Sequence, residues 1–319
     1  MEGLRHRVVL DTDLAMGAPG SDIDDGFALA LAVADPEIDL DLVTTVAGNT
    51  DVVTATTLTL ELLQRLGSPD VPVHRGAAHP LLRPPARTGS PPPGVTAREP
   101  ASTLAAVALV EHVRRHPGEI TLVAIGPLTN VALAVRLDPG FAAGLRRLVV
   151  MGGEFLRAPH DVGMPGEFNL WCDPEAARVV LGSGLVPEFV GLDVTTRVRI
   201  SREEALTMAR SPRPFTAFAG EFTAAYVEEL DPRYAVPPGT TALHDPLAVA
   251  AVTRPGLLTW REAHVEVETG DRLRGVVLTD FLDAADPPAA NARVAVDVDV
   301  EGFRERFSTL LDAVGADGT

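Results

Sequence analysis

The order of apolar and polar positions predicts a chain of alternating strands and helices. Short apolar runs are typical of buried strands, and longer segments with apolar residues at helical spacing are typical of the helices that cover them. The expected strands are residues 8–10, 40–46, 71–73, 120–125, 148–151 and 188–191, with strand-like alternation at 264–268, 275–278 and 294–300. The expected helices are residues 27–34, 51–66, 102–113 with Ser102 as cap, 201–208, 215–230, 247–252 and 303–314, with others that open at 126–130 and near Pro174. This alternation indicates an α/β fold with an open, mostly parallel, doubly wound (Rossmann-like) sheet flanked by helices.

Neither an internal repeat nor a shift in composition divides the chain. Its 319 residues are enough for one large α/β domain or two smaller ones. Residues 80–100 are rich in proline, arginine and glycine, which predicts a surface loop that could act as a flap. We therefore expect a single domain over residues 1–319.

A dense group of acids follows the first predicted strand. Asp11, Asp13, Asp22, Asp24 and Asp25 lie between this strand and the next predicted helix. In an open parallel sheet, ligand sites form outside the carboxyl ends of the strands. Carboxylates crowded there repel one another unless a cation neutralises them, and an all-oxygen set favours calcium or magnesium over zinc. In the alternative interpretation, some of these aspartates only cap the helix or interact with its positive N-terminus.

Polar residues also follow other predicted strands. Asn49, Glu167 with Asn169, and His244 with Asp245 would come to the same edge of the sheet and share a pocket with the acids. Acids and amides suit the vicinal hydroxyls of a sugar, and calcium can take two such hydroxyls as ligands while an adjacent aspartate acts as general base on a water. In the alternative interpretation, Asn49 is a turn residue or helix cap, and the extended segment at 167–169 is a solvated loop.

Charge and residue usage exclude several classes of function. The formal net charge is −17, so neither nucleic acid nor an anionic membrane is expected as a partner. All 27 basic residues are arginines, and the lack of lysine excludes a Walker-type phosphate site and a lysine Schiff base. No apolar run approaches the roughly 18 residues of a membrane span, and the first strand leaves no room for a signal peptide. Because the single cysteine, Cys172, cannot form an internal disulfide, we expect a cytoplasmic protein.

Six short motifs, in register over about residues 8–250, carry a resemblance to a known family. They are Asp11-Thr12-Asp13 with Asp24-Asp25, Val46-Ala47-Gly48-Asn49, Gly126-Pro127-Leu128-Thr129-Asn130, Met151-Gly152-Gly153, Glu167-Phe168-Asn169 with Asp173-Pro174-Glu175-Ala176-Ala177, and His244-Asp245-Pro246. Each motif alone is weak, but together they resemble the inosine-uridine-preferring nucleoside hydrolases. The resemblance implies the nucleoside hydrolase fold and calcium-dependent hydrolysis of ribonucleosides to ribose and free base, with a purine or broad preference. It also implies a small-molecule nucleoside as partner, a role in nucleoside salvage, and a homodimer or homotetramer.

The resemblance further implies a role for each residue of the site. The calcium ligands would be Asp13, Asp25, the main-chain carbonyl of Ile125, and Asp245. The residues that hold the ribose hydroxyls would be Asp24, Asn49, Glu167 and Asn169. Asp13 would also take the proton from the water that attacks the anomeric carbon, and His244 would donate a proton to a departing purine.

The sequence departs from the family pattern in three places. Ten residues, 14–23, separate Asp13 from Asp24 and include the extra acid Asp22, a longer segment that is typical of a subgroup. Asp161 stands where an amide is expected to contact the 5′-hydroxyl, which leaves a riboside modified at that position as an alternative substrate. Residues 83–100 lack the histidine of pyrimidine-preferring members, although His79 lies close enough to keep that preference open.

Two other classes of function remain open on the sequence. Asp11 could be the nucleophile of a magnesium-dependent phosphatase, but that chemistry usually needs a downstream lysine, and the chain has none. The protein could instead bind calcium and ribose without catalysis. For Tyr226, stacking on the nucleobase and packing in the core are both compatible with the sequence.

Overall fold

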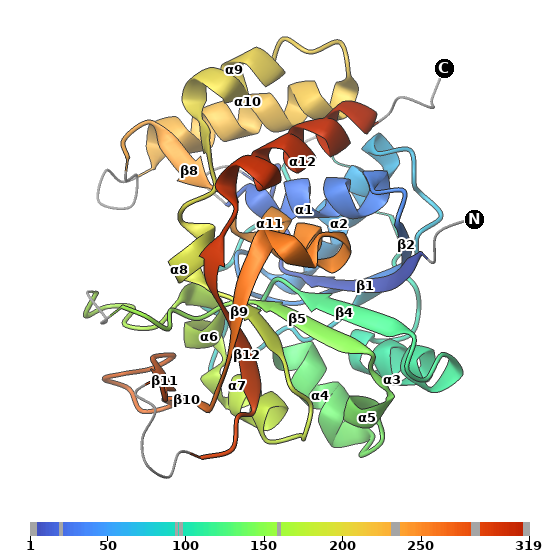
Figure 1. Ribbon diagram of the computed structural model, residues 1–319. Coiled ribbons are helices and arrows are strands. Elements are labelled where there is room, and N and C mark those ends of the chain that lie inside the picture. The colour runs from blue at the N-terminus through green and yellow to red at the C-terminus, as the bar shows by residue number, and fades with distance from the viewer. Residues whose placement is uncertain are drawn as a thin grey trace.

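The computed structural model describes residues 5–18, 22–92, 95, 98–157, 161–230, 237–281 and 288–314. They contain an eight-stranded sheet with the strand order β3-β2-β1-β4-β5-β6-β12-β9 (Figure 1). Its strands are β1 (His6–Thr12), β2 (Ile38–Thr45), β3 (Val73–Arg75), β4 (Ile120–Ala124), β5 (Arg147–Met151), β6 (Glu188–Val190), β9 (Leu258–Ala263) and β12 (Ala292–Val298). Each neighbouring pair is parallel except β9 with β12. The predicted α/β fold with a mostly parallel sheet is therefore confirmed.

Helices cover both faces of the sheet and bury an apolar layer against each. They are α1 (Asp24–Ala34), α2 (Val52–Arg65), α3 (Ala105–Arg115), α4 (Thr129–Leu137), α5 (Phe141–Gly144), α6 (Phe168–Cys172), α7 (Pro174–Leu181), α8 (Leu192–Thr195), α9 (Arg202–Met208), α10 (Pro214–Glu229), α11 (His244–Thr253) and α12 (Val300–Ala313). Core residues of α1, α11 and α12 belong to one layer, and those of α3, α4 and α7 to the layer on the opposite face (Figure 1). Within β1, Val8 and Leu10 pack in the first layer and Val9 in the second. This burial on both faces is the reason why the first strand is an uninterrupted apolar run.

The strand order places β1 at the point where the topology changes direction. From β1 the sheet continues through β2 and β3 on one side and through β4, β5 and β6 on the other. In open α/β sheets, ligands bind in the crevice at such a switch point, beyond the carboxyl ends of the strands. Asp13 directly follows β1 and Ile125 directly follows β4, so both residues lie at this crevice.

The structure corrects several predicted elements. The helix expected from Ser102 begins at Ala105 and has no side-chain cap, because the chain is still extended at Ala101, which bridges to His74. The segments 264–268 and 275–278 do not join the main sheet. They form the separate antiparallel hairpin β10 (Val265–Val267) and β11 (Val277–Thr279).

Other elements have no signal in the apolar pattern. β9 is an antiparallel edge strand with mostly half-exposed or exposed residues, so neither a buried run nor a clean alternation marks it. β7 (Arg199–Ser201) and β8 (Thr240–Ala242) form a small antiparallel ladder of their own. Among the described residues, no helix is both long and apolar enough to cross a membrane. That the chain forms one domain stays a prediction.

Candidate active site

Two helix N-termini bring three aspartates together near the carboxyl end of β1. Asp24 and Asp25 are the first residues of α1, and Asp245 is the second residue of α11. The three residues are buried, and their carboxylate oxygens lie within 4.8 Å of one another. The N–H of Asp245 donates to Oδ2 of Asp24 at 3.0 Å, which joins positions 221 residues apart. The positive end of each helix dipole favours carboxylates at these positions.

Asp13 lies beside this group, and one of its oxygens is unpaired. Its Oδ2 accepts the N–H of Asn49 at 2.7 Å, whereas its Oδ1 is buried without a hydrogen-bond partner in the described part of the chain. Gly48 permits this approach, because a Cβ at that position would lie only 2.0 Å from Oδ2 of Asp13. Asn49 also donates through Nδ2 to Asp25 at 3.1 Å. The residues that follow β2 therefore position two of the acids.

In the part of the chain that the structure describes, the acids lack a counter-charge. Burial raises the pKa of Asp13 to about 7, and burial followed by the charges of neighbouring aspartates raises the pKa values of Asp24, Asp25 and Asp245 well above the ordinary range. Among the described residues, no arginine or histidine forms an ion pair with any of the four. A buried all-oxygen set with an unpaired oxygen fits a hard divalent cation. The donor set is therefore consistent with the predicted metal ion.

Further polar groups come from the ends of β4 and β5 and from α6. The side-chain amide of Asn169 donates to the main-chain carbonyls of Ile125 (3.0 Å) and Met151 (3.2 Å), so it lies where these strands end. The extended chain predicted around this residue is wrong, because Glu167 caps the short helix α6. The Glu167 carboxylate accepts two amides of α6 and the N–H of Gly153. Burial of this carboxyl raises its pKa.

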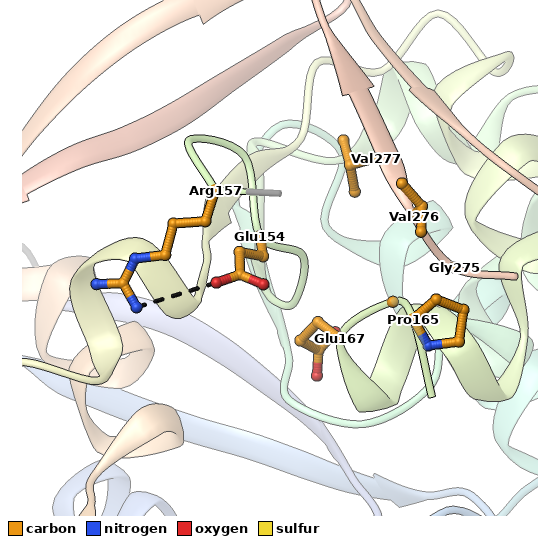
Figure 2. A pocket seen from close by; sticks show the side chains of 8 residues that line it. Glu154, Arg157, Pro165, Glu167, Gly275, Val276 and Val277 are labelled. Carbon is orange, nitrogen blue, oxygen red and sulfur yellow. Dashed lines mark ion pairs between the residues drawn. The ribbon is translucent and has the colours of Figure 1, made fainter. Parts of the chain in front are cut away.

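A small polar hollow of about 10 Å³, roughly the space of one water molecule, adjoins Glu167 (Figure 2). Its lining residues are Glu154, Arg157, Pro165, Gly166, Glu167, Gly275, Val276 and Val277. Arg157 and Glu154 form a loose ion pair there at 4.0 Å. Asp161 lies on the same connection between β5 and α6, and its Oδ1 accepts the N–H of Gly163 at 2.7 Å. The part of the site beside Glu167 is thus surrounded by charged and polar side chains.

His244 begins α11, directly before Asp245. Its Nδ1 lies 2.7 Å from the hydroxyl oxygen of Thr195, the last residue of α8. Burial lowers the pKa of His244, and the nearby Arg199 lowers it further against the opposing effect of Asp22. Burial and Arg199 thus favour the neutral imidazole over the imidazolium.

Asp22 of the 14–23 segment and Tyr226 of α10 complete this side of the site. Tyr226 is hydrogen-bonded to Asp22. Both residues lie near Asp24: the charge of Asp22 helps to raise the pKa of Asp24, and the charge of Asp24 helps burial to raise the pKa of Tyr226. The ring of Tyr226 is partly buried and packs against the core, as one of its two predicted roles requires. Residues 19–21 of the 14–23 segment lie outside the described residues.

Sequence reasoning missed two residues that contact the site. Arg87 lies in the predicted 80–100 loop, with its guanidinium 4.4 Å from the ring centroid of Phe168 and 3.3 Å from Oδ1 of Asn49. The arginine-rich composition of this loop is its only signal in the sequence. Thr195 has no signal, since its contact with His244 joins residues 49 positions apart.

Asp11 is separate from the acid group that faces the crevice. It is 0 % exposed, and its Oδ1 accepts the hydroxyl of Thr44 and the amide of Asn130. Because the carboxylate is enclosed and tied between β1, β2 and α4, it cannot reach a phosphate ester in this conformation. The geometry therefore disfavours the phosphatase alternative.

Comparisons with known proteins agree with this arrangement. Residues 8–305 match the family model described as inosine-uridine preferring nucleoside hydrolase. The chain is 33% identical to "Uridine nucleosidase 1" of Arabidopsis thaliana, over 97% of this chain and 94% of the relative. It is 36% identical to "Non-specific ribonucleoside hydrolase RihC" of Escherichia coli O1:K1 / APEC, over 97% of this chain and 99% of that protein.

Solved structures give the same result. The "Plant nucleoside hydrolase - PpNRh1 enzyme" superposes with a TM-score of 0.85 at 30% identity, covering 98% of this chain and 99% of the other. The "Purine-Preferring Ribonucleoside Hydrolase from Gardnerella vaginalis" has a TM-score of 0.81 at 25% identity, over 97% and 98% of the two chains. The protein thus belongs to the inosine-uridine preferring nucleoside hydrolase family.

Proposed function

We propose that the protein is a calcium-dependent hydrolase of the N-glycosidic bond of ribonucleosides, with a purine or broad base preference. The observation that carries the proposal is the buried group of Asp13, Asp24, Asp25 and Asp245, which has no counter-charge among the described residues and lies at the switch-point crevice. Family membership supports the reaction class. The relatives support a broad preference, since their names cover uridine, unspecified ribonucleosides and purine ribonucleosides.

The proposed ligands of calcium are Asp13, Asp25, Asp245 and the main-chain carbonyl of Ile125. Asp13 offers its unpaired Oδ1, and the carbonyl of Ile125 keeps a second lone pair beside the one that accepts from Asn169. When bound, the ion neutralises the buried carboxylates and polarises water and sugar hydroxyls that it contacts.

Asp13 is the proposed general base and His244 the proposed donor to the leaving group. Asp13 takes a proton from the attacking water, whose oxygen bonds to the anomeric carbon. The bond between that carbon and the base nitrogen breaks through an oxocarbenium-like transition state, and its electron pair goes to the base. The base receives a proton through His244, which takes a replacement proton from solvent, and Asp13 returns its proton to solvent when the products leave. The products are ribose and the free base.

The proposed ribose contacts surround this centre. Asp24 and Asn49 lie on the side of β1 and β2, where a carboxylate can accept and an amide can donate to vicinal hydroxyls. Asn169 and Glu167 lie on α6 on the other side. Oε1 of Glu167 accepts one backbone N–H and keeps a second lone-pair site for a hydroxyl, whereas Oε2 already accepts two. Asp161 is the proposed contact at the 5′ end, and a riboside modified at that position is the alternative substrate.

The first test is release of base and reducing sugar from purine, pyrimidine and 5′-modified ribosides, with and without a chelator. Chelator-sensitive release that calcium restores is expected, and the panel ranks the bases. Calcium binding without turnover of any riboside would refute catalysis and favour the binding-only alternative. Release that persists at full rate after removal of all divalent ions would refute the metal dependence.

Two variants test the assigned roles. Asp13→Ala should lose both calcium binding and activity, because it removes a ligand and the base, whereas Asp312→Ala removes an exposed aspartate and serves as control. His244→Ala should reduce the turnover of purine ribosides most. Wild-type turnover by the Asp13 variant would refute the mechanism.

We also propose a homodimer or homotetramer, on the family resemblance alone. Light scattering coupled to gel filtration distinguishes the two from a monomer.

A further inference from the structure

The buried contact between Thr195 and His244 links two elements of the site. Thr195 ends α8, which follows β6, and His244 begins α11. The distance from Oγ1 to Nδ1 is 2.7 Å, and Thr195 is 0 % exposed. Because the threonine is fully buried and the histidine partly buried, a hydrogen bond of this length constrains both the orientation of the ring and the location of its proton.

The partners available to the Thr195 hydroxyl show which of the two groups donates in this hydrogen bond. If Nδ1 carried the proton and donated to Thr195, the threonine hydroxyl would need another acceptor. Within the described residues, His244 is the one partner that this hydroxyl has. The arrangement that leaves no buried donor unsatisfied has the hydroxyl donating to Nδ1. Nδ1 is then the acceptor, and the proton of the neutral ring is on Nε2.

The second ring nitrogen is available to a ligand. Nε2 of His244 makes no hydrogen bond to a described residue, and it is not among the enclosed polar atoms that lack a partner. His244 is only partly buried, so its ring keeps some exposure at the site. The next residue, Asp245, belongs to the acid group, so a bound riboside would lie beside this edge of the ring.

We propose that Thr195 is a positioning residue that holds His244 as the Nε2–H tautomer, so that the neutral imidazole presents a hydrogen-bond donor to the departing base. This inference rests on the proposed function. It goes beyond that function because it assigns the tautomer, the residue that selects it and the donor atom.

The tautomer can be measured without turnover. The ¹⁵N shifts of the two ring nitrogens, recorded by long-range ¹H–¹⁵N correlation and assigned with His244→Gln, report which nitrogen is protonated. Wild type and Thr195→Ser should show the Nε2–H form. Thr195→Val, which keeps the side-chain shape but removes the hydroxyl, should show increased Nδ1–H population. A wild-type ring in the Nδ1–H form, or a tautomer that does not respond to the valine variant, would overturn the proposal even if the enzyme hydrolysed no riboside.

Kinetics with two leaving groups then test the consequence. Hypoxanthine needs a donor when it leaves inosine, whereas 4-nitrophenolate leaves 4-nitrophenyl riboside as a stable anion. Thr195→Val should lower kcat/KM for inosine roughly 10- to 100-fold and leave the nitrophenyl riboside within about threefold of wild type. Thr195→Ser should restore both activities.

The adjacent threonine is the matched control. The hydroxyl of Thr196 donates to Leu192 O within α8 at 2.7 Å, so Thr196→Val removes a hydroxyl from the same helix without touching His244. This variant should hydrolyse both substrates at wild-type rates. An equal loss on both substrates in Thr195→Val would indicate a structural effect and overturn the positioning role. Failure of the wild type with every riboside would refute the proposed function instead, while the tautomer measurement still decides the inference.

Discussion

At Gly48, a single added methyl group should impair the site while the protein still folds. A Cβ there would lie 2.0 Å from Oδ2 and 2.8 Å from Cγ of Asp13, and 2.8 Å from Cδ of Pro127. The backbone at Gly48 is in a region open to other residues, so the effect of Gly48→Ala is steric. Ordinary contact begins at 3.4 Å, so the Asp13 carboxylate has to retreat by at least about 1 Å and loses its hydrogen bond from Asn49.

The magnitude follows from this displacement. Overpacking of this kind costs about 1–3 kcal/mol of stability, which a domain of this size should survive. Misplacement of a catalytic group by about 1 Å costs roughly 100-fold in rate, so kcat/KM for a good riboside should fall by about that factor. Under the proposed function, calcium at about 100 times its Kd should add about 2.7 kcal/mol to the stability of the wild type, or several degrees in Tm, and Gly48→Ala should lose most of this increment.

The assay pairs steady-state release of base with thermal unfolding in calcium and in chelator. Gly256→Ala is the control, because a Cβ at Gly256 meets no heavy atom within 4 Å and the backbone there is not left-handed. Gly256→Ala should match the wild type in both measurements. A Gly48→Ala variant with activity within about threefold of wild type and an unchanged calcium shift would refute the argument that this close approach positions Asp13.

Three further predictions follow from the charges. Asp245→Asn should stabilise the metal-free protein, because it removes one of the mutually repelling buried charges, yet it should abolish activity and the calcium-induced rise in Tm; a retained calcium shift would contradict the assignment of this ligand. The Tm difference between calcium and chelator should grow from about pH 4 to pH 7. Burial raises the pKa of the proposed ligand Asp13 from its ordinary value to about 7, so in this range the metal-free native state holds a proton that the unfolded chain has lost, and its stability falls as the pH rises; a difference that shrinks with pH would argue against this linkage. Arg274→Lys should lower Tm by several degrees, because the buried guanidinium donates to both oxygens of Glu175 and to two main-chain carbonyls of α6, a geometry that lysine cannot reproduce. Arg272→Lys, at an exposed position, is the control, and equal Tm values for the two variants would refute the reasoning.

Local sequence patterns were sufficient for most of the central sheet. Strands such as β1 and β4 are buried on both faces, so their apolar runs are continuous and easily recognised. The same reasoning did not predict β9, whose antiparallel pairing with β12 depends on a strand about 30 residues further along the chain. It predicted the strands of the β10–β11 hairpin but placed them in the main sheet, whereas they pair with each other. Short helices such as α6 were also not predicted, because five residues are too few to show helical periodicity.

The sequence by itself determined that acids, amides and one histidine follow successive strands, since the chemistry of Asp13, Asn49 and Asp245 is encoded beside recognisable strand ends and helix starts. Only the tertiary structure decided how these groups meet. The N-termini of α1 and α11 meet, which places Asp24 in contact with Asp245. The lack of a Cβ at Gly48 leaves room for the Asp13 carboxylate. The end of α8 places the Thr195 hydroxyl against Nδ1 of His244. Each of these contacts joins segments far apart in the chain, and its energy depends on distance and burial. These quantities arise from packing across the sheet, so no local pattern of residues records them.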